Sequence, residues 1–132
     1  VASILKGLPE PGVFFQIGIN PIITVGKDTI HNELIRRAGG VNIYEDASAR
    51  YPRCGIEEII VRRPDIIIIS SMKRGGDFLN VRDGWKKWET IPAVRDDRIH
   101  IIDADIVDHA SPRIVDGLEK MARIIHPDVL WK

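Results

Sequence analysis

A run of four isoleucines at positions 66–69, inside the segment Asp65–Ser70, constrains the fold more than any other feature of the sequence. A strand with one face in water alternates apolar and polar residues, whereas this run is apolar on both faces. Such a run is typical of a central strand in a parallel sheet that helices cover on both sides. With 132 residues, the chain is long enough to build one domain of this kind.

Further strands and helices are expected to alternate along the chain. The expected strands are Val13–Ile19, the short Val41–Ile43 and Ile99–Ile102. The expected helices are one that Asp28 or Thr29 caps and Gly39-Gly40 ends, one around Ile56–Ile60 that stops before Pro64, one over Asp83–Thr90, and one that Ser111 caps and that runs to Ile125. The predicted fold class is therefore α/β: a three-layer Rossmann-like lobe with a mostly parallel central sheet flanked by helices.

Composition and motifs exclude several functions. The 19 basic and 19 acidic residues cancel, which argues against a dedicated nucleic-acid binder. Cys54 is the only cysteine, so neither an internal disulfide nor a cysteine metal cluster can form, and no apolar stretch is long enough to span a membrane. Dinucleotide, phosphate-loop, nucleophile-elbow and zinc-protease motifs are absent, so we expect no enzyme, no cofactor and no metal. The histidines lack metal-ligand spacing, and His31 is expected on an exposed helix face.

A ligand is expected at the loops that follow the strands, because open parallel sheets bind ligands outside the carboxyl ends of their strands. The four loops are Gly18–Gly26, Tyr44–Arg53, Ser70–Asp77 and Asp103–Ala110. Their candidate side chains are Tyr44, Arg50, Tyr51, Arg53, Met72, Lys73, Arg74, Asp105, Asp108 and His109. This mixture suits a ligand with both apolar and polar surface.

Five segments, taken in order, resemble the C-terminal lobe of the helical-backbone (class III) periplasmic binding proteins. They are Val13–Gly26, Arg37–Asn42, Glu57–Ile69, Trp88–Asp103 and Ala110–Pro127. The resemblance implies two α/β lobes joined by a long helix, with residues 1–8 as the end of that helix and residues 9–132 as the C-terminal lobe. It also implies a periplasmic or otherwise extracytoplasmic protein, with or without a lipid anchor, that binds a small molecule for an ABC importer. Its partners are then a metal chelate as ligand and the importer's permease.

The resemblance assigns roles to particular residues. Glu57, with Glu58 as the alternate, matches the carboxylate that docks on the transporter. The expected ligand contacts are Tyr51, Arg53, Met72, Arg74, Asp105, Ile106, Asp108, His109 and Arg113. The loop 105–109 contains no aromatic residue, which favours a ferric siderophore over cobalamin; haem also stays open within the family. A Rossmann-like enzyme and a stand-alone interaction domain remain the alternatives from other classes.

Overall fold

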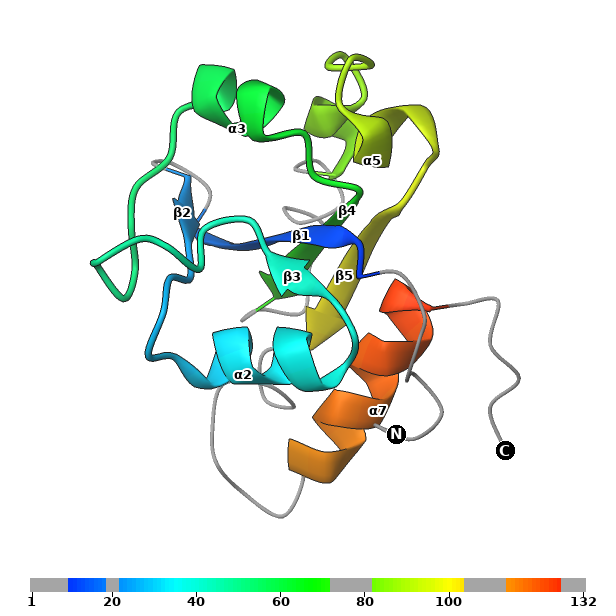
Figure 1. Cartoon of the computed structure of the whole chain (residues 1–132). Helices are drawn as coiled ribbons and strands as arrows, with labels where there is room; N and C mark the ends of the chain where they lie inside the picture. The colour runs from blue at the N-terminus through cyan, green and yellow to red at the C-terminus, as the bar shows by residue number, and fades with distance from the viewer. Residues whose placement is uncertain (1–9, 19–21, 72–81, 104–113, 127–132) are drawn as a thin grey trace.

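Five strands form one sheet at the centre of the computed structural model (Figure 1), which describes residues 10–18, 22–71, 82–103 and 114–126. The strands are β1 (Gly12–Gly18), β2 (Ile23–Thr24), β3 (Val41–Asn42), β4 (Ile66–Ser71) and β5 (Ile99–Asp103). Strand β4 pairs in parallel with β1 and β5, and β3 pairs in parallel with the start of β1. Only the two-residue β2 is antiparallel, against the end of β1. The predicted mostly parallel sheet is confirmed.

Helices cover both faces of this sheet, so the fold has the predicted three layers (Figure 1). Helices α2 (Ile30–Arg37) and α7 (Ile114–Ile125) lie on one face, and α3 (Ile56–Arg62) and α5 (Pro92–Arg95) lie on the other. Ile66 and Ile68 belong to the core on the α2 and α7 side, whereas Ile67 and Ile69 belong to the core on the opposite side. All four side chains are 0% exposed, as the four-isoleucine run predicted.

The helix ends follow from local chemistry that the sequence reveals. Thr29 is the N-cap of α2, and its hydroxyl accepts a hydrogen bond of 3.1 Å from the backbone N–H of Asn32. Gly39 follows this helix with a φ of 88°, a left-handed conformation that glycine adopts at low cost. The last residue of helix α3 is Arg62, and its C-cap Arg63 stands just before Pro64, so the helix stops where predicted.

Two expectations about the elements are wrong. Within the expected helix Asp83–Thr90, the helical residues stop at Trp85, and the chain then makes tight turns. Helix α5, which was not predicted, follows these turns and has Pro92 at its first position. His31 is 5% exposed instead of lying on an open helix face, and its ring packs against Phe15 at a centroid distance of 5.1 Å. The expected cap Ser111 lies outside the described residues.

Candidate functional site

The carboxyl ends of β1, β3, β4 and β5 point to the same edge of the sheet because these strands are parallel. The predicted loops all begin at this edge. Much of the loops after β4 and β5 lies outside the described residues, and so do seven of the predicted ligand contacts: Met72, Arg74, Asp105, Ile106, Asp108, His109 and Arg113. The structure therefore describes Tyr51 and Arg53 among the predicted ligand contacts, together with the two predicted docking residues, Glu57 and Glu58.

Main-chain hydrogen bonds hold the segment 50–54 at the carboxyl edge. The N–H groups of Thr24 and Gly26 donate to the carbonyl oxygens of Pro52 and Arg50, at 3.1 and 2.8 Å. The N–H of Cys54 donates in turn to the carbonyl oxygen of Ile22 at 2.9 Å. Because Ile23 also pairs with the end of β1, the segment 50–54 extends the sheet locally. Its path is set by the backbone and leaves its side chains available for other contacts.

Tyr51 and Arg53 project from this segment into solvent. The Tyr51 side chain is 50% exposed, and Arg53 is exposed as well. The guanidinium of Arg50 lies 6.0 Å from the centre of the Tyr51 ring. An aromatic ring and two cations therefore stand together at the edge where a ligand was expected.

Gly26 makes the close approach of this segment possible. A Cβ atom at position 26 would lie 2.2 Å from the carbonyl oxygen of Ala49, which is backbone and cannot move aside alone. Only glycine lets the loop after β2 and the loop after β3 come this close.

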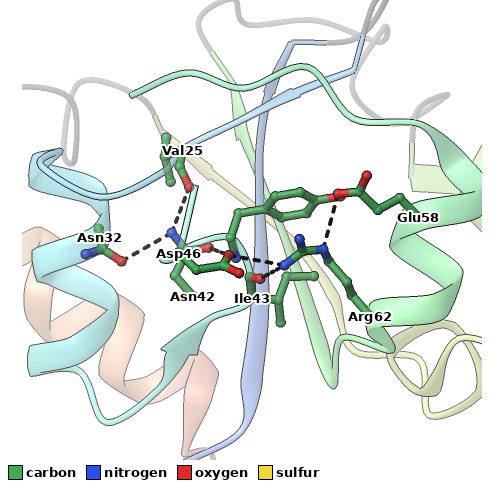
Figure 2. Close-up of polar contacts among 8 residues, drawn as sticks. Val25, Asn32, Asn42, Ile43, Asp46, Glu58 and Arg62 are labelled. Atoms are coloured by element: carbon green, nitrogen blue, oxygen red, sulfur yellow. Dashed lines mark hydrogen bonds and ion pairs between the residues drawn. The ribbon is translucent and has the colours of Figure 1, made fainter. Parts of the chain in front are cut away.

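Asn42, at the end of β3, ties the surrounding elements together (Figure 2). Its amide nitrogen donates to the carbonyl oxygen of Val25 at 2.7 Å and to the side-chain oxygen of Asn32 at 3.2 Å. Its side-chain oxygen accepts from the N–H of Tyr44 at 3.0 Å. The Asn42 side chain is 0% exposed, so these hydrogen bonds compensate for its burial. They fix where the loop 44–53 starts.

Arg62 of α3 holds the next turn of the same loop (Figure 2). Its guanidinium donates to the carbonyl oxygen of Ile43, and it forms ion pairs with Glu58 at 3.2 Å and with Asp46 at 3.4 Å. It also lies 4.3 Å from the centre of the Tyr44 ring, within cation–π distance. One side chain thus connects helix α3 to the loop that carries Tyr51 and Arg53.

Tyr44 is a core residue and not the loop-surface residue that the sequence suggested. Its side chain is 3% exposed, and its ring packs against Phe14 at a centroid distance of 5.9 Å. Burial raises the pKa of its hydroxyl, and the nearby Glu58 carboxylate raises this pKa further. The hydroxyl nevertheless has no hydrogen bond of good geometry in the described part of the chain, so we take Glu58 as a close neighbour and not as a bonded partner.

The two predicted docking carboxylates have different surroundings. Both lie in the first turn of α3 and both are exposed. Glu58 is paired with Arg62, whereas Glu57 has no ion pair or hydrogen bond with any residue that the structure describes. Among the described residues, therefore, no cation offsets the charge of Glu57.

A cavity of about 220 Å³ opens beside the end of β1, and sequence reasoning did not assign it. It is lined by Gln16, Ile22, Ile56, Gly84, Trp85, Lys87 and Trp88. The Lys87 ammonium lies 5.4 Å from the centre of the Trp88 ring. The close spacing of two tryptophans, Trp85 and Trp88, is the signal that could have pointed to this apolar wall.

Two negative findings hold for the described part of the chain. No group of three or more histidine, cysteine, aspartate or glutamate side chains is placed to hold a metal ion there. Among the same residues, no helix has the length and apolar character needed to cross a membrane.

Comparison with known proteins gives consistent matches. The profile of a family described as "Periplasmic binding protein" matches residues 6–106. The vitamin B12-binding protein of Vibrio vulnificus is 32% identical over 117 residues, which are 88% of this chain and 41% of that protein. The vitamin B12-binding protein of Salmonella paratyphi A is 30% identical over 109 residues, or 83% of this chain and 38% of that protein.

Solved structures match the fold over almost the whole chain. The periplasmic vitamin B12-binding protein of Vibrio cholerae superimposes with a TM-score of 0.82 and 26% identity, covering 96% of this chain and 48% of that one. A structure from Staphylococcus epidermidis is described as a possible iron-binding (periplasmic solute-binding) protein. It superimposes with a TM-score of 0.79 and 30% identity, covering 94% of this chain and 50% of that one. In each case the chain spans half or less of the protein that it matches.

Proposed function

Because this chain belongs to the periplasmic binding protein family, we propose that it is the C-terminal lobe of an extracytoplasmic protein that binds a small molecule and delivers it to an ABC importer. The observation that carries the proposal is the parallel sheet whose loops start from a single edge. That edge forms one half of a clamp, and a second lobe would supply the other half. The proposal assigns residues 1–8 to the linking helix and residues 9–132 to the lobe.

The chemistry proposed for this edge is binding and not catalysis. Tyr51 offers an aromatic surface on which an apolar part of a ligand can lie, and Arg53 offers a cation for an anionic group. Met72, Arg74, Asp105, Ile106, Asp108, His109 and Arg113 remain proposed contacts from the neighbouring loops. Affinity would come from both lobes closing on the ligand, so this lobe alone is expected to bind it weakly.

For the cargo we propose a corrinoid such as vitamin B12. This revises the expectation from sequence, which placed a ferric siderophore first because residues 105–109 include no aromatic side chain. The named relatives that share about 30% of their residues with this chain are vitamin B12-binding proteins, and they favour the corrinoid. A ferric siderophore is the second candidate, supported by the likeness to the possible iron-binding protein of Staphylococcus epidermidis.

For docking on the importer's permease we propose Glu57, with Glu58 as the alternate. Both carboxylates lie on the exposed side of α3, and this helix covers the sheet face opposite α2 and α7 (Figure 1). Glu57 follows segment 50–54 by three residues, so this docking surface adjoins the carboxyl edge where the cargo is expected.

Calorimetric titration of the full-length protein tests the cargo proposal. The ligands are cyanocobalamin and a ferric hydroxamate siderophore, and the variants are Tyr51→Ala and Arg53→Ala. We expect cyanocobalamin to bind, and each variant to raise its Kd by roughly tenfold, the factor that a loss of about 1.4 kcal/mol produces.

The control variant is Arg36→Ala, which removes an exposed cation on α2, away from the edge. It should leave the Kd unchanged. Binding of the siderophore alone would replace the corrinoid by the second candidate. Failure of Tyr51→Ala and Arg53→Ala to change any Kd would remove segment 50–54 from the cargo site.

A further inference from the structure

The cavity beside the end of β1 has the size for a single small ring system. Its volume is about 220 Å³. Pockets that enclose drug-sized ligands measure about 300–1,000 Å³, whereas an apolar cavity of roughly 150 Å³ in another protein binds benzene. The space is therefore large enough for an aromatic ring with a substituent and too small for a whole drug-sized molecule.

The walls of this cavity are mostly apolar and held in place. The apolar side chains among its lining residues are Ile22, Ile56, Trp85 and Trp88. The Trp85 side chain is 3% exposed, and its ring packs edge-on against Phe14 at a centroid distance of 5.9 Å. The backbone N–H of Trp88 donates to the carbonyl oxygen of Trp85 at 2.9 Å, so one tight turn carries both indole rings. The apolar wall is therefore formed before any ligand binds.

One lysine adds a positive charge to this wall. Lys87 lines the cavity, and its ammonium lies 5.4 Å from the centre of the Trp88 ring. The neighbouring Lys86 is paired with Asp83 at 3.4 Å, whereas Lys87 forms no ion pair with any residue that the structure describes. The charge of Lys87 is therefore available to a ligand that also lies against the tryptophan.

The cavity adjoins the edge where the cargo is expected. The carbonyl oxygen of Ile22 accepts a hydrogen bond of 2.9 Å from the backbone N–H of Cys54. Ile56, the first residue of α3, follows Cys54 by two positions. Two of the lining residues thus border segment 50–54, which carries Tyr51 and Arg53. A molecule held at this edge has the cavity as its neighbour.

We infer that this cavity is a binding site for a flat ring that bears an anionic group, such as an aromatic carboxylate. The ring lies against the two tryptophans and the two isoleucines, which removes apolar surface from water on both sides. The anionic group pairs with the ammonium of Lys87. A ring of the cargo and a free aromatic acid offer this same chemistry. As a part of the cargo site the cavity rests on the proposed function, and as a site for a free acid it goes beyond that function.

The test is an NMR titration of the ¹⁵N-labelled full-length protein with 4-bromobenzoate and with its neutral analogue 4-bromobenzamide. We expect saturable shifts of the indole N–H signals of Trp85 and Trp88, and a Kd about threefold lower for the acid than for the amide. Lys87→Gln should remove this preference for the acid. Lys86→Gln is the matched control: it removes a lysine that does not line the cavity, so the preference should remain.

A second variant, Gly84→Leu, fills the cavity. Gly84 is a lining residue, and a Cβ atom there would meet nothing within 4 Å, so leucine can occupy the space without displacing other atoms. We expect this variant to raise the Kd of both probes by about tenfold or more. Thermal unfolding should show an unchanged fold.

Competition with cyanocobalamin and with a ferric hydroxamate siderophore separates the two sources of the ring. If a bound cargo displaces 4-bromobenzoate and Gly84→Leu weakens that cargo, the ring belongs to the cargo. If cargo and acid bind together, or if the acid binds and neither cargo does, the cavity is a site for a free acid; the last result counts against the proposed cargo alone. The inference is overturned if neither indole signal shifts, if Gly84→Leu binds the probes as the wild type does, or if Lys87→Gln keeps the preference for the acid.

Discussion

The indole N–H of Trp85 donates a hydrogen bond of 3.0 Å to the side-chain oxygen of Gln16, and both side chains are buried. This bond joins residues 82–88 to the carboxyl end of β1, although the two partners are 69 positions apart in sequence. The amide nitrogen of Gln16 donates in turn to the carbonyl oxygen of Gly18 at 3.0 Å. Gln16 thereby fixes one wall of the cavity beside the candidate cargo edge.

Replacing Gln16 by leucine should lower the free energy of unfolding by about 1–3 kcal/mol, because it leaves a buried indole N–H without its acceptor. In the double variant Gln16→Leu/Trp85→Phe the donor is gone as well. The combined loss should therefore be smaller than the sum of the two single losses. Urea denaturation of the wild type and the three variants measures this coupling. Strictly additive losses would show that the hydrogen bond contributes nothing of its own.

The variant Gly26→Ala should lower the free energy of unfolding by about 1–3 kcal/mol, since its new methyl group collides with the carbonyl oxygen of Ala49 and the backbone must shift. Gly84→Ala is the control: a Cβ there meets nothing within 4 Å, and alanine favours the helical conformation of residues 82–85. Thermal unfolding should give a lower Tm for the first variant and an unchanged or higher Tm for the second. Equal Tm values would contradict the close approach of the two loops.

The stability of the chain should fall as the pH drops below about 6.5, the ordinary pKa of histidine, in part through His100. Burial lowers the pKa of the folded-state imidazole, and the charge of Arg98 lowers it further. The unfolded chain then binds a proton at a higher pH than the folded chain does. Stability from this group is present above the unfolded-state pKa and is lost as the pH falls toward the folded-state pKa.

The variant His100→Gln removes this contribution. Urea denaturation at pH 7.5 and at pH 5 should show a smaller loss of stability for the variant than for the wild type. Other titrating groups are present in both proteins, so their effects cancel in the comparison. One of them is Glu33, whose hydrogen bond with Arg37 lowers its pKa. An identical pH dependence of the two proteins would exclude His100 as its source.

Much of the fold could be predicted because its strongest signals are local. Four consecutive isoleucines can be buried only where both faces of a strand are covered, and Thr29 and Gly39 mark the ends of α2 by side-chain and backbone chemistry. The parallel pairing of β3 with β1 starts the loop of Tyr51 and Arg53 at the carboxyl edge, and the antiparallel bridge between Ile23 and Arg53 holds the loop there. The fold prediction therefore rested on residues whose surroundings are dictated by their near neighbours.

One of the errors is local, and the others depend on distant parts of the chain. His31 was counted as polar, yet it lies four residues before the buried Ile35 and seven before Ala38, so it shares their side of the helix. Tyr44 follows a strand, as a cargo residue would, but Arg62 and Phe14 enclose it. The wall of the 220 Å³ cavity combines residues of β1 with residues 84–88. These two segments are far apart in sequence, so no local sequence pattern shows that they meet.

Segment 50–54 owes its path to main-chain hydrogen bonds with residues 22–26, and such bonds form equally with almost any side chain. The backbone path of segment 50–54 therefore does not depend on which side chains it carries. Small, acidic or bulkier residues could replace those at positions 51 and 53 while the segment keeps its position. A protein of this kind could be retargeted to new molecules by exchanging a few side chains, with no redesign of the sheet beneath them.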